Sequence, residues 1–289
     1  MPEAKSQSPV VQIDVEKIIR SQSHPLLRRL PRPFIWLIKK IIHQDEINEG
    51  LRKFGHLKNF EFIEAVLQYL NIKVEAYGTH HIPSHGDVIF VGNHALGGAD
   101  FLALMHILKD YYPRINHLTN DLLMGIKPLE DFFIPVNVFG KNPEHYRRLY
   151  DERLSEPGIP ISIFPSGEVA RYRKGRWDDG LWRSGFVRFA KKFDKTVVPF
   201  FIPTRNSKLF YRVHRFRKWL GIKANLELFL LPHELLKMRN RTVRIIFGAP
   251  LPPSFFDDSK SIHEWAGVVK QRAYALTNNP EYNTAIHEG

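Results

Sequence analysis

The chain has 289 residues, with 42 Lys and Arg against 30 Asp and Glu, a formal net charge of +12 and no cysteine. Apolar residues make up 43% of the chain and charged residues 25%, which excludes collagen-like, coiled-coil and mostly disordered proteins. The lack of cysteine excludes disulfide bonds, thiolate metal sites and a cysteine nucleophile. The positive charge favours anionic partners such as nucleic acid, acidic lipid or a phosphorylated ligand.

The N-terminal part of the chain is polar and then alternates basic and apolar residues. Residues 1–20 contain acidic residues and lack the apolar stretch of a secretion signal, so we expect a loose N-terminus and no export. The chain contains no window of 18 apolar residues, so the sequence predicts no membrane-spanning helix. Residues 34–42 predict a short helix with aromatic and aliphatic residues beside Lys39 and Lys40. This helix either lies in a membrane interface or packs in the core with its lysines in solvent.

The rest of the chain alternates helical and extended patterns. The spacing of apolar residues predicts helices at 59–70, 101–108, 185–193 and 262–276. Alternating or continuous apolar runs predict strands at 72–77, 88–91, 133–136, 159–164, 197–202, 226–231 and 243–247. This order is typical of a layered α/β sheet, and no repeat or low-complexity linker indicates a second domain.

Positive charge is concentrated in one segment of the chain. Residues 171–223 hold sixteen Lys and Arg against three Asp, a local net charge of +13. This basic segment either forms a solvated face or marks a surface for an anionic membrane or an anionic ligand.

The segment GNHALGGAD, which follows the second predicted strand, has the clearest chemical content. Asn93 and His94 come directly after the strand, Gly97 and Gly98 permit a tight turn, and Asp100 lies where the next helix begins. In α/β sheets, catalytic groups commonly lie at such strand-to-helix crossings. The segment is therefore a candidate catalytic loop.

His94 and Asp100 are six positions apart, so on one helix they would lie on different faces and only the glycine turn can bring them together. If it does, the carboxylate holds one imidazole nitrogen protonated and leaves the other free to take a proton from a hydroxyl group. Alternatively, Asp100 is the N-cap of a helix that begins at Phe101, and His94 is an ordinary loop histidine.

A second loop again places polar residues after an apolar strand. Its sequence FPSGEVAR contains Pro165, Gly167, Glu168 and Arg171. Glu168 could orient a partner or accept a hydroxyl group, and Arg171 could hold a phosphate or carboxylate through paired hydrogen bonds. The alternative is a turn with a surface ion pair. A third block, VVPFFIP, by itself indicates only a core strand.

The order of the blocks GNHALGGAD, FPSGE and RNSKLFY resembles the lysophospholipid acyltransferase superfamily, and most of all its bacterial hemolysin-like branch. The likeness covers about residues 60–252. Members of this superfamily transfer a fatty acyl group from an acyl carrier protein or coenzyme A thioester to a hydroxyl of a lysolipid, without a metal, a tightly bound cofactor or an acyl-enzyme. The resemblance implies a single α/β domain with a mixed sheet flanked by helices, seated on the cytoplasmic face of the membrane.

The resemblance also implies roles for particular residues. His94 would be the general base and Asp100 its partner. The residues implied to shape the loops are Asn93, Gly97, Gly98, Pro165 and Gly167, and those implied to bind the acceptor are Lys141, Glu168 and Arg171. Lys141 is the only cation in the block 133–141, where relatives usually offer an arginine to phosphate. The acceptor is therefore either similar to lysophosphatidic acid or an acyl-amino-acid lysolipid.

Together these patterns predict four parts of the chain: a flexible N-terminus (1–20), a helical segment that faces the membrane (21–71), an α/β core (72–255), and a C-terminal helix with a polar tail (256–289). We expect an acyltransferase of membrane lipid biosynthesis, peripheral on the inner face of the cell membrane. Its expected partners are an anionic membrane surface, a lysolipid acceptor and an acyl-carrier-protein or coenzyme A thioester.

A basic nucleic-acid-binding protein is an alternative from another class. The positive charge supports it, as do aromatic residues that could stack on bases, such as Trp177, Trp182, Tyr211 and Phe216. No zinc-finger, RNP or basic-zipper pattern accompanies them, so we expect no specific nucleic-acid partner.

A hydrolase is a further alternative, because a His/Asp pair could equally activate water or a serine. Ser162 and Ser166 lie near the second block, but no Gly-x-Ser-x-Gly elbow occurs there. A metal enzyme would need ligands such as those of the cluster His80, His81, His85 and Asp87. That cluster lacks a helical pair of ligands, so no metal is expected.

Overall fold

The computed structural model describes residues 12–21, 28–136, 144–173, 175–219 and 230–283. A seven-stranded sheet lies at its centre, formed by β1 (Lys73–Tyr77), β2 (Val88–Gly92), β3 (Asn116–Asn120), β4 (Phe133–Val136), β5 (Ile161–Ile163), β8 (Thr196–Phe201) and β9 (Thr242–Phe247). The helices are α1 (Val15–Ser21), α3 (Arg32–Ile42), α4 (Gln44–Phe54), α5 (Asn59–Tyr69), α6 (Gly98–Leu108), α7 (Glu144–Ser155), α8 (Gly185–Phe193), α9 (Lys208–Trp219), α10 (Leu231–Lys237) and α11 (Ile262–Ala275).

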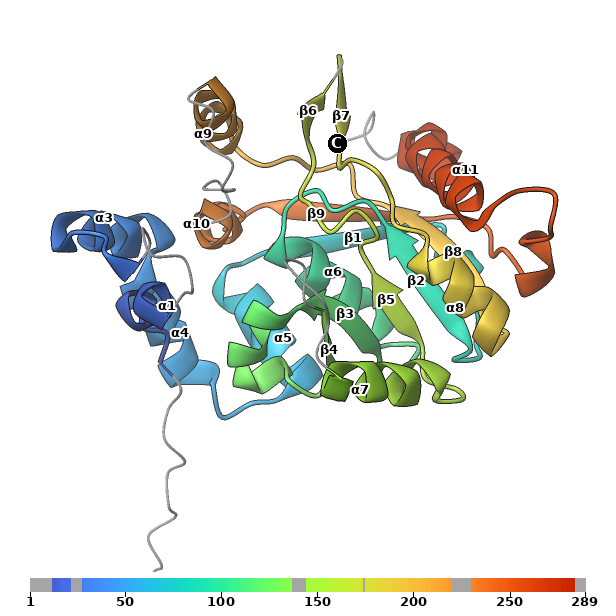
Figure 1. Cartoon of the computed structure of the whole chain (residues 1–289), viewed down its shortest axis with the longest axis horizontal. Helices are drawn as coiled ribbons and strands as arrows, with labels where there is room; N and C mark the ends of the chain where they lie inside the picture. The colour runs from blue at the N-terminus through green and yellow to red at the C-terminus, as the bar shows by residue number, and fades with distance from the viewer. Residues whose placement is uncertain (1–11, 22–27, 137–143, 174, 220–229, 284–289) are drawn as a thin grey trace, which may run out of the picture.

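The sheet is mixed, as predicted. Its strand order is β1-β9-β8-β2-β5-β3-β4. The neighbouring strands run parallel except β8 and β9, which are antiparallel. A separate antiparallel hairpin, β6 (Arg171–Arg173) with β7 (Arg176–Asp178), projects away from the sheet (Figure 1). The fold is therefore the α/β class with flanking helices that the sequence predicts.

Side chains alternate between two hydrophobic layers along the central strands. On β2, Val88 and Phe90 belong to the layer that packs against α5 and α6, whereas Ile89 and Val91 belong to the layer that packs against α8 and α11. All four side chains are fully buried. A strand buried on both faces is a near-continuous apolar run, which is usual for inner strands of parallel sheets. This burial fixes the carboxyl end of β2 in the middle of the sheet.

Most elements agree with the sequence predictions. The predicted helices at 34–42, 59–70, 101–108, 185–193 and 262–276 correspond to α3, α5, α6, α8 and α11, with ends that differ by a few residues. The predicted strands at 72–77, 88–91, 133–136, 159–164, 197–202 and 243–247 correspond to β1, β2, β4, β5, β8 and β9. Four of the six residues of the strand predicted at 226–231 lie outside the described residues, and the other two are the N-cap and first residue of α10, Leu230 and Leu231.

The sequence patterns miss β3 because its side chains are mostly polar. Asn116 and His117 are nevertheless buried. The Asn116 amide donates to the carbonyl oxygen of Arg153 at 2.7 Å, and His117 Nδ1 shares a hydrogen bond with Ser162 Oγ at 2.8 Å. Distant segments thus satisfy the buried polar groups, and a local hydropathy pattern does not contain that information.

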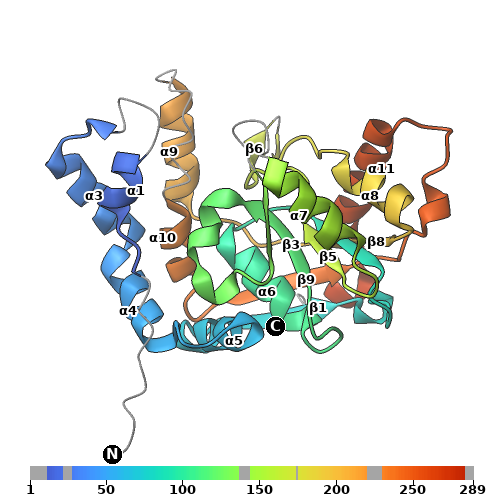
Figure 2. The same cartoon turned by 60° about the horizontal axis from the view of Figure 1, so that its bottom comes forward.

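Helices α1, α3 and α4 lie together at one end of the molecule, beside α9 and α10 (Figure 2). The expectation of a loose segment up to residue 20 is wrong for its last part, which forms most of α1. Val15 and Ile19 of this helix are buried against Ile42 of α3. Burial of apolar side chains stabilises a helix that is too short to persist alone.

Helix α3 packs against protein on one side only. Ile35 and Ile42 are buried, whereas Phe34, Trp36 and Leu37 are 57%, 61% and 48% exposed. No helix among the described residues is long and apolar enough to cross a membrane. Helix α3 therefore leaves aromatic and aliphatic side chains uncovered within the part of the chain that the structure describes.

A buried lysine joins the amino ends of the central strands. Lys195 is 1% exposed, and its ammonium donates to Asp87 Oδ1 at 3.1 Å and to the carbonyl oxygens of Glu156 and Ile159 at 3.0 and 3.3 Å. The backbone N–H of Gly158, together with Lys195, holds the pKa of Asp87 below its usual range. These bonds link the segments that precede β2, β5 and β8.

Replacement of Lys195 by alanine is expected to destabilise the protein by about 2–3 kcal/mol, because two carbonyl groups and a carboxylate lose a charged donor. Urea unfolding followed by circular dichroism measures this change. The control is Lys192→Ala, which removes an exposed ion pair with Asp151 and should cost less than about 1 kcal/mol. Equal losses in the two variants would contradict a structural role for the buried lysine.

Candidate active site

The candidate catalytic loop begins just beyond the carboxyl end of β2. This strand lies between β5 and β8, and all three run parallel, so the loops that follow them leave the sheet at the same edge. The backbone N–H of Ala170, in the second loop, donates to the carbonyl oxygen of His94 at 2.6 Å. The Asn93 side chain exchanges two hydrogen bonds of 2.9 and 2.7 Å with the backbone of Ile202. The segments GNHALGGAD, FPSGEVAR and VVPFFIP thus meet at one site.

The glycine turn brings His94 and Asp100 into contact. His94 Nδ1 lies 2.8 Å from Asp100 Oδ2. An ionised carboxylate can only accept, so in the tautomer that donates from Nδ1 to this oxygen Nε2 has the free lone pair. Asp100 is fully buried, whereas the His94 side chain is 20% exposed. The arrangement is that of a base held in one tautomer by a buried carboxylate.

The same carboxylate oxygen closes the turn. Asp100 Oδ2 also accepts the backbone N–H groups of Leu96 at 2.8 Å and Gly97 at 3.1 Å. Gly97 has a φ of +92°, a conformation that L side chains rarely adopt, so this position favours glycine. Asp100 is the third residue of α6 and Gly97 is its N-cap, so the alternative that Asp100 caps a helix beginning at Phe101 is wrong. Gly98, exposed, opens the helix.

Three further contacts fix the orientation of His94. Its backbone N–H donates to Asp179 Oδ2 at 3.2 Å, and its carbonyl oxygen accepts the N–H of Ala170. Its ring stacks on Phe164, with centroids 4.4 Å apart and an interplanar angle of 13°. With Nδ1 bound to Asp100, Nε2 is the ring nitrogen left for a substrate.

The second loop holds Glu168 beside two arginines. Glu168 Oε2 accepts from Arg171 Nη1 at 2.8 Å and from Arg173 Nη2 at 2.6 Å. The Glu168 side chain is 45% exposed, while that of Arg171 is 1% exposed. The ion pair is therefore half-buried, unlike the surface pair considered as an alternative. Binding of the acceptor by these residues remains a prediction.

Two of the remaining predicted site residues, Pro165 and Gly167, belong to the second loop. Pro165 is buried, and its carbonyl oxygen accepts the N–H of Arg183 at 3.0 Å. Gly167 is exposed and has a φ of +63°, which an L side chain rarely adopts. Both therefore lie in the turn that carries Glu168. Lys141 lies outside the described residues.

The serines considered for a hydrolase pair elsewhere. Ser162 is fully buried and bonds to His117, and Ser166 Oγ donates to the carbonyl oxygen of Glu168 at 2.9 Å. Among the described residues, no hydrogen bond joins either serine to His94. In the described part of the chain, neither serine therefore forms the pair with His94 that a serine hydrolase would need.

Residues of the cluster considered as metal ligands also have other partners. Asp87 bonds to Lys195 and to the N–H of Gly158, while the rings of His80 and His81 lie 4.0 Å apart. In the ranges that the structure describes, no group of three or more His, Asp or Glu side chains could hold a metal ion.

Sequence reasoning misses two buried polar residues near His94. Asp179 follows β7 and accepts the His94 N–H, and His117 lies on β3 beneath Phe164, with ring centroids 5.5 Å apart. Neither residue lies in a block whose pattern marks chemistry, and their partners come from distant segments. Only the fold brings them to this edge of the sheet.

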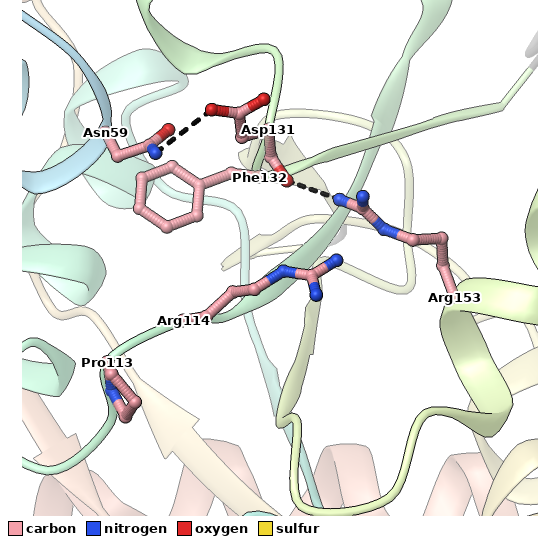
Figure 3. A pocket seen from close by; sticks show the side chains of 6 residues that line it. All are labelled: Asn59, Pro113, Arg114, Asp131, Phe132 and Arg153. Carbon is pink, nitrogen blue, oxygen red and sulfur yellow. Dashed lines mark hydrogen bonds between the residues drawn. The ribbon is translucent and has the colours of Figure 1, made fainter.

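A cavity of about 320 Å³ lies away from this site. It is lined by Asn59, Pro113, Arg114, Asp131, Phe132 and Arg153 (Figure 3). Several of these residues directly precede β3 and β4, so the cavity is at the amino edge of the sheet, opposite His94. Arg114 pairs with Glu156 at 3.1 Å, and Arg153 donates to the Asp131 carbonyl. These existing partners occupy the two arginines.

Comparison with known proteins shows the family of the chain. A family model described as Acyltransferase matches residues 17–282. The chain is 35% identical over 265 residues to lyso-glycine lipid O-acyltransferase of Bacteroides thetaiotaomicron. The aligned region covers 91% of this chain and 97% of that protein. A protein of the same name from Phocaeicola vulgatus is also 35% identical over 265 residues, or 91% of this chain and 95% of that protein.

The chain therefore belongs to the acyltransferase family, within the lysophospholipid acyltransferase superfamily that its motifs predict. It is an O-acyltransferase enzyme. Among solved structures, the crystal structure of the 1-acyl-sn-glycerophosphate (LPA) acyltransferase, PlsC, from Thermotoga maritima is similar with a TM-score of 0.45 and 17% identity, covering 86% of this chain and 82% of that chain.

Stability should depend on pH through His117. Burial, and then the nearby His94, lower the pKa of His117 from 6.5 to about 3. Between those values the unfolded chain binds a proton that the folded protein does not, so the free energy of unfolding falls as the pH falls. The slope from this group is about 1.4 kcal/mol per pH unit at most.

The variant His117→Gln is expected to flatten this dependence between pH 6 and pH 4. Urea unfolding at a series of pH values measures the slope. His80→Gln, which removes an exposed histidine, is the control for loss of a histidine as such. Identical slopes in His117→Gln and the unmodified protein would contradict a buried neutral histidine.

Proposed function

We propose that this protein transfers a fatty acyl group from a thioester to the free hydroxyl of a lyso-glycine lipid. The observation that carries the proposal is the His94–Asp100 pair, whose partly exposed imidazole lies where the segments GNHALGGAD, FPSGEVAR and VVPFFIP meet. The identity to two proteins named lyso-glycine lipid O-acyltransferase, over nearly their whole length, supports the acceptor class.

The proposed chemistry needs one base and no acyl-enzyme. His94 Nε2 takes the proton of the acceptor hydroxyl as its oxygen attacks the thioester carbonyl. Asp100, bound to Nδ1–H, stabilises the imidazolium that forms. When the tetrahedral intermediate collapses, the carbon–sulfur bond breaks and Nε2 returns the proton to the leaving thiolate. The products are an ester and a thiol, and the histidine regains its initial state.

The charges of the chain support anionic substrates. A lyso-glycine lipid carries a carboxylate, and the basic segment at 171–223 has a net charge of +13. Glu168, Arg171 and Lys141 are the residues that we propose for contact with the acceptor head group. The donor is proposed to be an acyl-carrier-protein or coenzyme A thioester, because both carry negative charge that a basic surface attracts.

We propose a peripheral position on the inner face of the cell membrane. The support comes from exposed apolar side chains on two helices: Phe34, Trp36 and Leu37 on α3, and Phe216 and Trp219 on α9, the last two 60% and 77% exposed. Ile41 of α3 packs in the cluster around Phe210 of α9, so the two helices are neighbours. Helix α9 contains five Lys and Arg residues and no acidic one. Aromatic residues beside basic ones suit the interface of an anionic bilayer.

His94→Ala is expected to lower kcat at least about 10³-fold, and Asp100→Asn about 10³- to 10⁴-fold, because the first removes the base and the second its charged partner. In the assay, the purified protein is given a labelled acyl donor, either an acyl-carrier-protein thioester or a coenzyme A thioester. The acceptor is a lyso-glycine lipid. Parallel reactions contain lysophosphatidic acid, and transfer to that acceptor alone would contradict the proposed acceptor.

The matched control is His106→Ala, because His106 forms a similar 2.6 Å pair with Glu64 and lies on the same helix as Asp100. This variant should keep its activity within about twofold. Thermal unfolding shows that each variant is folded. Substantial transfer by folded His94→Ala would remove His94 as the base.

Membrane binding should depend on the exposed side of α3. The double variant Phe34→Ala/Trp36→Ala is expected to bind anionic vesicles about tenfold or more weakly, because it removes two aromatic groups from the interface. Co-sedimentation with phosphatidylglycerol vesicles at low salt measures the binding. Tyr111→Ala, which removes an exposed aromatic residue outside both helices, is the control. Unchanged binding of the double variant would contradict this membrane contact.

A further inference from the structure

We infer that Asp179 is a positioning residue for His94, and that it holds the catalytic loop against the C-terminal helix α11. This inference rests on the proposed function, because it assigns Asp179 an effect through His94. Asp179 is fully buried and touches the backbone of His94, 85 positions away in the chain.

Every described contact of the Asp179 carboxylate is with a donor. Oδ2 accepts the His94 N–H at 3.2 Å, and the indole N–H of Trp182 lies 3.0 and 3.1 Å from the two oxygens. The hydroxyl of Tyr274 donates to Oδ1 at 2.8 Å and accepts the backbone N–H of Asp179 at 3.1 Å. Lys270 Nζ lies 3.7 Å from Oδ1. Two of these partners, Tyr274 and Lys270, belong to α11.

Burial of a carboxylate is costly, and here it raises the pKa of Asp179 despite the donors around it. Apolar residues of similar size could fill this space in the layer under α8 and α11 without that cost. Unlike an apolar side chain, the carboxylate accepts hydrogen bonds, and of its hydrogen-bond donors only the His94 N–H belongs to the loop that carries the candidate base. The geometry therefore points to a role in the catalytic loop.

The bond to Asp179 completes the restraint of His94. Its carbonyl oxygen is held by Ala170 and its Nδ1 by Asp100, so the amide is the remaining backbone group that needs a partner. A histidine fixed at both backbone groups and at one ring nitrogen can present Nε2 in one direction. Displacement of a reacting group by about 1 Å can cost about 10²-fold in rate, so a loose loop would lower kcat.

The test compares Asp179→Ala and Asp179→Asn with Asp178→Ala. Asp178 is the matched control because it is also buried and binds the same lysine, with Lys270 Nζ 2.8 Å from its Oδ1, yet it has no described contact with His94. We expect Asp179→Ala to lower kcat about 10- to 100-fold with KM for both substrates unchanged within about threefold. Asp178→Ala should keep kcat within about threefold.

The conservative variant Asp179→Asn separates acceptance of the His94 N–H from the negative charge of the side chain. Asp179→Asn keeps an oxygen that can accept the His94 N–H, so it should retain clearly more activity than Asp179→Ala. Tyr274→Phe, which removes one donor to Asp179 and leaves the carboxylate in place, should lower kcat less than Asp179→Ala. It also keeps the inference testable if Asp179→Ala does not fold.

Hydrogen–deuterium exchange supplies a readout other than activity. The peptide that contains His94 should exchange faster in Asp179→Ala than in Asp178→Ala, because only the first frees the His94 N–H. Equal loss of kcat in the two alanine variants, in proportion to their loss of thermal stability, would show a merely structural role and overturn the inference. Absence of acyl transfer by the unmodified protein would instead count against the proposed function.

Discussion

The site depends on the carboxylate of Asp100, which is buried at the first turn of α6. One of its oxygens accepts three hydrogen bonds, from the His94 ring and from the backbone of Leu96 and Gly97. The bonds that close the glycine turn are thus made by the same atom that orients the His94 ring. Local folding and catalytic geometry cannot be separated at this point, because a change in the turn moves the partner of His94.

The parallel strands around β2 give this loop its surroundings. Because β2, β5 and β8 end at one edge, Phe164 and Ala170 of the second block and Ile202 of the third reach the catalytic loop directly. On the other face, Asp179 connects the loop with α11. His94 therefore receives support from segments on both sides of the sheet, which favours one fixed orientation of its ring.

The sequence predicts the elements whose apolar side chains form a simple pattern. Strand β2 is apolar on both faces, and α5 has one clear apolar stripe, so both appear at their observed places. Strand β3 is missed because Asn116 and His117 are buried through hydrogen bonds to distant residues. The segment before residue 20 is mispredicted because α1 depends on burial against α3, which no local pattern reveals.

The amino-acid sequence by itself determined the family, the candidate base and its partner, because a histidine, a glycine turn and an aspartate at fixed spacing form a local motif. It also determined the α/β class through the alternation of apolar patterns. Only the tertiary structure decided that Arg171 is buried beside Glu168 and that Asp179 reaches the backbone of His94. The physical reason is that hydrogen bonds between buried groups depend on distance in space, and sequence separation does not encode that distance.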